Sequence, residues 1–250
     1  MQQRYTGSAT PIVRRPDLLR LAKYVLREAK MALGGREERT PEHVRTSYEQ
    51  LAVNFYEASE RMRPFIVDGR LRSANGWAFR REIARRIIDQ TGGRGRLLEV
   101  GAGDGINVWT IDQTQPHHRL HVTGFDFAAN RVQLAATQAP QHDWCVGDAR
   151  RIPFADDSFD ITYTVHCLEQ LPYYATAVLR EMRRVGRAVL LFEPFYEHQN
   201  VVGKMHNRSR DYVRDLSSSV EAAGLRCLEF VRLGHGVVGN QCSMMLCEKP

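Results

Sequence analysis

Apolar residues in the first third of the chain recur with the period of a helix. From Pro16 to Leu33 they form one stripe and Gly34-Gly35 follows, which predicts an amphipathic helix with a glycine stop. A second helix is expected from Thr40 to Tyr56, because a capping residue precedes proline at the first helical position. A third is expected from about Asn75 to Gln90. Three helices are therefore predicted ahead of the first strand.

After Gly95 the pattern changes to short apolar runs separated by segments of helical character. The five runs are Leu97–Val100, Leu120–Phe125, Asp143–Val146, Phe159–Tyr163 and Ala188–Phe192. Such alternation predicts parallel strands that crossover helices bury on both faces. Two further runs, Arg226–Val231 and Cys242–Glu248, are joined by glycines without a helix. These two are expected to pair antiparallel at one edge of the sheet.

These elements predict an α/β fold with a helical addition in front. Residues 1–75 are expected to form an N-terminal helical extension or lid, and residues 76–250 the core domain. With 43% apolar and 26% charged side chains, 250 residues suffice for one sizeable core, which excludes a fibrous, collagenous or wholly disordered chain. No export signal is visible, and no run approaches the roughly 18 to 20 apolar residues of a membrane span.

The five cysteines favour a reducing compartment. They are odd in number and form no C-x-x-C pair, so no disulfide framework is expected and a cytoplasmic protein is the default interpretation. His117, His118 and His121 lie around the entry to the second core strand, but no matching carboxylate pair stands nearby in the sequence. A metal site is therefore not expected.

Basic residues are concentrated at the front of the chain. Residues 1–96 hold 20 lysines and arginines against 11 acidic residues, whereas residues 97–250 hold 15 against 18. Two explanations stay open: solvated faces of the predicted helices, or electrostatic docking of a phosphate-bearing partner.

The segment Leu97–Gly105 runs from an apolar strand into three glycines at alternate positions. Glycine is needed where a strand turns sharply into a helix and the backbone lies against a ligand. A dinucleotide fingerprint that starts at Gly101 needs its third glycine where Ile106 stands, and no Walker lysine follows. The loop is therefore a poor match to a pyrophosphate cradle and excludes a nucleoside-triphosphate loop.

Glu99, two residues before the first glycine, together with the alternate glycines resembles the first motif of class I S-adenosylmethionine-dependent methyltransferases of the small-molecule type. Three more landmarks follow in that family's order: Val122–Asp126, Gly147–Ala149 and Arg150–Pro172. The resemblance covers roughly Gly95 to Pro194. It implies a Rossmann-like, doubly wound sheet of seven strands whose last strand is antiparallel, with S-adenosylmethionine as the cofactor.

The family's cofactor contacts carry over residue by residue. The resemblance implies that the glycine turn passes under the methionine part of the cofactor. It also implies that Asp126 accepts from the ribose hydroxyls and Asp148 from the adenine amino group. Phe127 and Val165 are expected as walls of the adenine and methionine pockets. The expected set is Glu99, Gly101, Ala102, Gly103, Asp126, Phe127, Asp148, Ala149 and Val165. For Asp126 a helix cap, and for Phe127 a buried aromatic, remain the structural alternatives.

His166 and Glu169 are the expected catalytic residues. His166 directly follows the fourth core strand, and an imidazole titrates near neutrality, so it is suited to take a proton from an acceptor hydroxyl. Glu169, three residues on, either orients that imidazole or binds a substrate amine. The alternatives are that His166 only orients a loop or contacts cofactor, and that Glu169 is a surface helix residue.

Four residues are expected to line the acceptor pocket. Tyr48 and Tyr56 lie on one predicted N-terminal helix that folds over the cofactor as a lid, while Glu193 and Tyr196 follow the fifth strand at the carboxyl edge of the sheet. Ordinary core packing is the alternative for the tyrosines of the helix.

The function implied by the resemblance is methyl transfer from S-adenosylmethionine to an oxygen or nitrogen of a small-molecule acceptor, such as a specialised metabolite or a sugar. The alternative is an RNA or protein methyltransferase that docks through the basic N-terminal region. The Asn/Asp-Pro-Pro-aromatic tetrapeptide of enzymes that modify base amines is absent, and Val165–Leu168 stands in its place. A third interpretation is a nicotinamide-binding protein or an inactive relative.

Overall fold

The structure is a computed structural model. It describes residues 22, 25–26, 64–67, 70–117, 119–233 and 240–250. The predicted helix from Thr40 to Tyr56 lies outside the described residues. So do Tyr48 and Tyr56 themselves. In the part of the chain that is described, no helix is long and apolar enough to cross a membrane.

Seven strands form one sheet in the order β5-β4-β3-β6-β7-β9-β8. Their bounds are β3 Arg94–Val100, β4 Arg119–Asp126, β5 Asp143–Val146, β6 Phe159–Val165, β7 Gly186–Glu193, β8 Arg226–Arg232 and β9 Ser243–Glu248. The first five pair in parallel, and β9 runs antiparallel to both β7 and β8. The expected α/β sheet of seven strands with an antiparallel last strand is confirmed.

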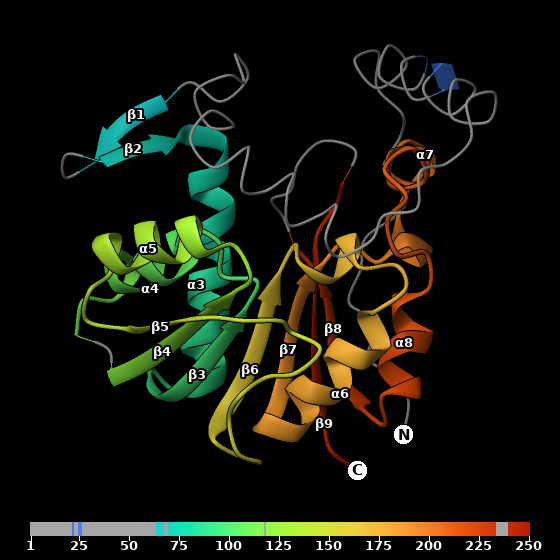
Figure 1. The fold of residues 1–250 in the computed structure, drawn as a ribbon. Coiled ribbons are helices and arrows are strands. Elements are labelled where there is room, and N and C mark those ends of the chain that lie inside the picture. The colour runs from blue at the N-terminus through green and yellow to red at the C-terminus, as the bar shows by residue number, and fades with distance from the viewer. Residues whose placement is uncertain (1–21, 23–24, 27–63, 68–69, 118, 234–239) are drawn as a thin grey trace.

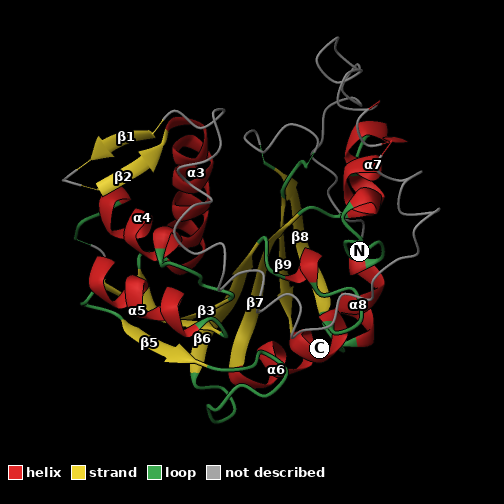
Figure 2. Ribbon diagram, turned by 45° about the horizontal axis from the view of Figure 1, so that its top comes forward, coloured by secondary structure: helices red, strands yellow, loops and turns green. Residues whose placement is uncertain are grey.

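Helices cover both faces of this sheet, as Figures 1 and 2 show. The helices are α3 Ala74–Thr91, α4 Ile106–Thr114, α5 Ala129–Gln138, α6 Ala175–Val185, α7 Val201–Ser209 and α8 Leu216–Ala222, with two short 3₁₀ turns, η1 Leu168–Gln170 and η2 Tyr196–His198. Residues of α3 and α4 share one core cluster with Leu97, while residues of α6 and α8 share the other with Leu98. Successive strand residues thus face opposite helix layers.

A two-stranded hairpin precedes α3 and was not predicted. Its strands are β1 Pro64–Val67 and β2 Arg70–Ser73, which pair antiparallel with Val67 opposite Arg70. The expectation of helices alone before the first core strand is therefore wrong. The predicted third helix agrees with α3 within one residue at each end.

The last two strands enter the sheet out of sequence order. The expected pairing of Arg226–Val231 with Cys242–Glu248 is confirmed, but β9 lies between β7 and β8, so β8 alone forms the edge. The inner position suits β9, because Met244 and Cys247 are fully buried. Residues just before β9, Asn240 and Cys242, thereby lie near the carboxyl end of β7.

Candidate active site

The glycine loop turns the chain from β3 into α4 across the end of β4. Gly101, Gly103 and Gly105 all have left-handed backbones, with φ of 78°, 54° and 77°. The amides of Gly101 and Ala102 donate to the carbonyl of Phe125 at 2.8 and 3.1 Å. The loop is therefore anchored on the neighbouring strand, and its sequence needs glycine where a side chain would strain the backbone.

Two of these glycines also permit close packing. A Cβ on Gly101 would clash with the Cys167 side chain, where it would meet the sulfur and lie 2.7 Å from the Cβ. A Cβ on Gly105 would lie 2.6 Å from the Trp144 ring. Gly101 thus brings the loop against the segment after β6, whereas Gly105 serves the contact of α4 with β5. The sequence motif alone does not separate these two roles.

Asp126 ties the end of β4 to the glycine loop. Its Oδ2 accepts from the Gly103 amide at 2.9 Å and its Oδ1 from the Ala128 amide at 2.9 Å. Burial raises the pKa of this carboxyl, although both amide bonds and Arg131 oppose the shift. Each carboxylate oxygen keeps a second lone pair, so Asp126 is able to hold the loop and still accept from a ligand hydroxyl.

Glu99 is fully buried beneath the loop and bonded to protein groups. Its two oxygens accept from Asn107 Nδ2 at 2.7 Å and from the Tyr163 hydroxyl at 3.0 Å, and Arg80 Nη1 donates to the Asn107 side chain at 2.7 Å. Burial raises the pKa of Glu99 to about 7, with those hydrogen bonds and Arg80 acting in the opposite sense. Glu99 therefore supports the loop from below, through partners that sequence reasoning missed.

The predicted adenine end of the site lies where β5 stops. Gly147 donates its amide to the carbonyl of Asp126 at 2.9 Å, which puts Asp148 beside the end of β4. Ala149 and Phe127 are half-buried, and Val165, the last residue of β6, is buried. The structure thus brings the expected cofactor residues to the carboxyl ends of four adjacent strands, the edge at which open α/β sheets bind ligands.

His166 has a left-handed backbone, with φ of 53°, and its amide donates to the carbonyl of Phe192 at 3.0 Å. Its Nδ1 lies 3.2 Å from Oε1 of Glu169, its ring meets Phe79 edge to face, and its Nε2 is buried without a hydrogen-bond partner. The other Glu169 oxygen accepts from Asn240 Nδ2 at 3.0 Å. A buried carboxylate therefore fixes one imidazole nitrogen, and the Cys242 side chain is a further neighbour of the ring.

The charge state of this pair follows from its surroundings. Burial lowers the pKa of His166, but the Glu169 carboxylate and the Cys242 sulfur outweigh it, so the pKa is raised well above its ordinary value. Because a carboxylate only accepts, the neutral imidazole keeps its proton on Nδ1 and presents the Nε2 lone pair. Glu169 is buried, so the alternative of a surface helix residue is excluded.

Glu193 is fully buried and holds the segment after β6. Its oxygens accept from three successive amides, those of Cys167, Leu168 and Glu169, at 2.9, 3.0 and 3.2 Å. Burial, helped by the nearby Glu169, raises its pKa to about 7. An acceptor that contacts Glu193, as predicted, would therefore have to bind oxygens that already accept from the amides at the start of η1.

Of the other predicted acceptor residues, only Tyr196 is described. It lies in η2, half-buried, with the Lys204 ammonium 5.6 Å from its ring centre. Contacts of Tyr196, Tyr48 and Tyr56 with an acceptor stay predictions.

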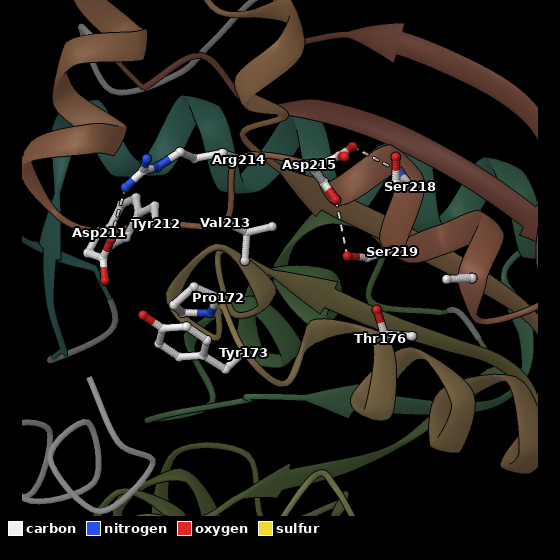
Figure 3. Close-up of a pocket in the computed structure, with 11 residues that line it drawn as sticks. Pro172, Tyr173, Thr176, Asp211, Tyr212, Val213, Arg214, Asp215, Ser218 and Ser219 are labelled. Carbon is white, nitrogen blue, oxygen red and sulfur yellow. Dashed lines mark hydrogen bonds and ion pairs between the residues drawn. The ribbon is translucent and has the colours of Figure 1, made fainter. Parts of the chain in front are cut away.

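A separate pocket of about 450 Å³ lies beside this edge, between the segment after η1 and the start of α8 (Figure 3). It borders the site, because Val213 in its wall donates its amide to the Glu169 carbonyl at 2.8 Å. Its lining residues are Pro172, Tyr173, Thr176, Asp211, Tyr212, Val213, Arg214, Asp215, Ser218, Ser219 and Ala222.

Among the histidines around the start of β4, His121 has a carboxylate partner. His121 Nε2 lies 2.7 Å from Asp143, and the buried His142, which follows α5, accepts from the Val122 amide through Nδ1 at 3.2 Å. Neither belongs to the edge that holds the glycine loop.

Comparison with known proteins agrees with this geometry. Residues 98–188 match the family model of a methyltransferase domain. The chain is 28% identical over 169 residues to an O-methyltransferase, rstn1, of Aspergillus nomiae, which is 60% of this chain and 72% of that protein. Residues 98–188 therefore form a methyltransferase domain.

Two further similarities extend this finding. This methyltransferase is 26% identical to a demethylmenaquinone methyltransferase of Thermotoga maritima over 163 residues, which is 64% of this chain and 64% of that protein. Its fold superposes on the crystal structure of the [4+2]-cyclase SpnF with a TM-score of 0.62, at 16% identity, over 86% of this chain and 99% of that one. The fold is thus shared with a protein named for a different reaction, so function has to be argued from the site.

S-adenosylmethionine is the cofactor of this enzyme class, and the residues present fit it. Among the described residues, only the Arg131 guanidinium lies near the Cβ position of Gly103, at 3.3 Å, and Asp126 keeps acceptor capacity toward hydroxyls. The carboxylates gathered at this edge suit a ligand that carries an ammonium and a sulfonium group.

Proposed function

We propose that this methyltransferase transfers the methyl group of S-adenosylmethionine to a hydroxyl oxygen of a small-molecule acceptor, with His166 as general base. The observation that carries the proposal is the His166–Glu169 pair at the carboxyl end of β6, in which Nδ1 faces a buried carboxylate. A hydroxyl must lose its proton as it attacks, and a positioned imidazole meets that need. A protonated amine must also lose a proton before its nitrogen can attack, so we propose a nitrogen acceptor as the second possibility.

The cofactor supplies a methyl group already activated by its sulfonium, so the chain's main task is to bind and orient. In the proposal, the backbone of Gly101–Gly103 would hold the methionine part and Asp126 would accept from the ribose. Asp148 would face the purine amino group, and Phe127 and Val165 would wall the site. Positioning of this kind can supply effective molarities of roughly 10⁵ to 10⁸ M.

The proposed task of His166 is to take the proton of the acceptor, and Glu169 prepares the imidazole for it. Glu169 holds Nδ1–H, which fixes the ring and raises its basicity, and Asn240 in turn holds Glu169. The Nε2 lone pair would take the acceptor proton as the acceptor oxygen gains the methyl group, and the methyl–sulfur bond would break with its electron pair left on sulfur, so that S-adenosylhomocysteine is the leaving group. The imidazolium that forms is stabilised by the Glu169 carboxylate. A small-molecule acceptor is supported by the relatives, whose names include an O-methyltransferase and a quinone-pathway methyltransferase.

The first experiment is calorimetric titration with S-adenosylhomocysteine, with NAD as the parallel control. Micromolar binding of S-adenosylhomocysteine alone supports the cofactor assignment, whereas binding of NAD, or of neither, contradicts it. A panel of small hydroxyl and amine acceptors is then screened for methyl transfer with the wild type. RNA enters the same panel, since salt-sensitive methylation of RNA would favour the alternative docking function.

His166→Gln tests the base within that assay. We expect turnover to fall by about 10² to 10⁴-fold, the usual contribution of general-base catalysis, while S-adenosylhomocysteine affinity stays unchanged. His121→Gln is the matched control, because it removes another histidine that faces a carboxylate, away from the glycine loop. Wild-type turnover in His166→Gln would remove His166 as the base.

A further inference from the structure

Two free cysteines face each other across the last two strands of the sheet. Cys227 in β8 and Cys247 in β9 are direct partners in the antiparallel register, and both pack in the same core cluster, so their side chains share one face of the sheet. Opposed residues of an antiparallel pair have Cα atoms about 4.5 to 5.5 Å apart. A disulfide needs a Cα separation of about 4.4 to 6.8 Å, so the backbone already has the spacing for one.

The two thiols differ in their access to solvent. Cys247 is fully buried in the inner strand β9, whereas Cys227 is half-buried in β8, the edge strand. The register shifts directly after Cys227, and its thiol donates to the Glu229 carbonyl of its own strand at 3.5 Å. A reagent from solvent therefore meets Cys227 first, and Cys247 stands opposite it as a second thiol.

Burial keeps both groups protonated near neutral pH. It raises the pKa of Cys227, and it raises the pKa of Cys247 further above its ordinary value, with the neighbouring Cys227 sulfur acting in the same sense. The thiolate is the species that attacks in thiol–disulfide exchange. The pair therefore rests as two thiols, reacts slowly, and should react faster as pH rises.

We propose that Cys227 and Cys247 are a reversible modification site, at which a small disulfide such as oxidised glutathione converts the two thiols into a cross-strand disulfide. The Cys227 thiolate attacks one glutathione sulfur, the glutathione S–S bond breaks, and one glutathione leaves and takes up the proton that Cys227 lost. The Cys247 thiolate then attacks the Cys227 sulfur, and the second glutathione leaves in the same way. Two protein thiols are oxidised while one disulfide is reduced to two glutathione molecules.

The new bond would tie the edge of the sheet to its interior. β8 pairs with the sheet through β9, and the disulfide would close residues 227–247 into a covalent loop. Cys247 is also opposite Val189, in the amino-terminal half of β7, whereas the glycine loop follows the carboxyl end of β3. The modification site is therefore separate from the candidate active site and does not depend on the proposed function.

The test incubates the folded, full-length protein with oxidised and reduced glutathione at a series of ratios, quenches it with acid and alkylates the remaining thiols. Peptide mass spectrometry with fragmentation then locates the linked sulfurs, because Cys242 and Cys247 fall on one tryptic peptide. We expect a Cys227–Cys247 disulfide that dithiothreitol reverses. Because a disulfide restrains the unfolded chain, the Tm of the oxidised protein should rise by about 5 to 10 °C.

Cys145→Ser is the matched control. Cys145 is also half-buried on an edge strand, β5, and burial raises its pKa too, but Phe125 is opposite it in the register. This variant should form the disulfide and gain Tm as the wild type does. Cys227→Ser should do neither. Cys247→Ala, which keeps a small apolar side chain in the core, should accumulate Cys227 as a mixed disulfide with glutathione.

Three results would overturn the proposal. In the wild type, Cys227 could end as a lasting mixed disulfide while Cys247 stays reduced. Both cysteines could stay reduced at ratios that modify Cys145. Cys227 could also be linked to a cysteine other than Cys247. Circular dichroism before and after oxidation checks that each variant is folded when it reacts.

Discussion

Cys167 lies over the α-carbon of Gly101, so close that a Cβ on Gly101 would come within 2.7 Å of the cysteine's own Cβ. This contact joins the loop after β3 to the segment after β6, the two places where the cofactor and the base are proposed to meet. The glycine loop is therefore held at its start by a protein neighbour and at Gly103 by Asp126.

Gly101→Ala should disrupt this contact. The added methyl meets Cys167 and the residue keeps a left-handed φ, so we expect about 2 to 4 kcal/mol of lost stability from overpacking and backbone strain together, with loss of S-adenosylhomocysteine binding. Gly92→Ala is the control, since Gly92 has a similar φ of 63° and open space around its Cβ position. Denaturant unfolding and calorimetry measure both effects. Equal losses in the two variants would show that strain alone, not the Cys167 contact, is responsible.

Titration of His166 should report its partnership with Glu169. The folded-state pKa is raised, so the pair contributes stability that is present below the unfolded value and is lost as pH rises through the folded value. We expect turnover to rise with pH over the same range, because the base must be neutral. Glu169→Gln should move the imidazole pKa, followed by NMR, back toward or below its ordinary value. Asn240→Ala should move it in the same direction by a smaller amount. An unmoved titration in Glu169→Gln would contradict the pairing.

Glu99 should make the fold less stable as pH rises from about 4.5 to 7. Its folded pKa of about 7 lies above the ordinary 4.5, so the folded state binds the proton more tightly, and ionisation costs up to about 3 kcal/mol across that window. Glu99→Gln removes this contribution, and the variant's free energy of unfolding should therefore decline less over the same pH range. Glu193 has a similarly raised pKa, so its contribution to the pH dependence of stability is present in both the variant and the wild type. Parallel curves for variant and wild type would contradict the assignment.

Asp126→Ala should weaken S-adenosylhomocysteine binding by roughly 1 to 3 kcal/mol, the cost of hydrogen bonds lost to a ligand. Part of this loss comes from the Gly103 amide, which loses its acceptor. Asp126→Asn keeps an acceptor of the same shape, so it should retain more affinity than alanine. Unchanged affinity in Asp126→Ala, measured by calorimetry, would sink the ribose assignment.

The strands and the loop were accessible to sequence reasoning because their signals are local. Leu97–Gly105 contains its own strand, its turn and its left-handed glycines, and the run Ala188–Phe192 is buried along its whole length apart from its first residue. The strand pair β1 and β2 was missed because each strand has only four residues, which is too short for a clear alternation of apolar and polar positions.

The partners within the site were not accessible, because they are set by strand order. Tyr163 reaches Glu99 across 64 residues only because β3 and β6 are neighbours in register. Asn240 reaches Glu169 across 71 residues because β9 inserts beside β7. No periodicity or spacing along the chain encodes such a contact, so the predicted His166–Glu169 pair was found and the residue that holds it was not.

The inner position of β9 makes two parts of the fold depend on one segment. β9 pairs with β7 on one side and with β8 on the other, so it joins the edge strand β8 to the rest of the sheet. Asn240, just ahead of β9, donates to Glu169. Residues 240–248 therefore couple the seating of the edge strand to the support of the Glu169 carboxylate.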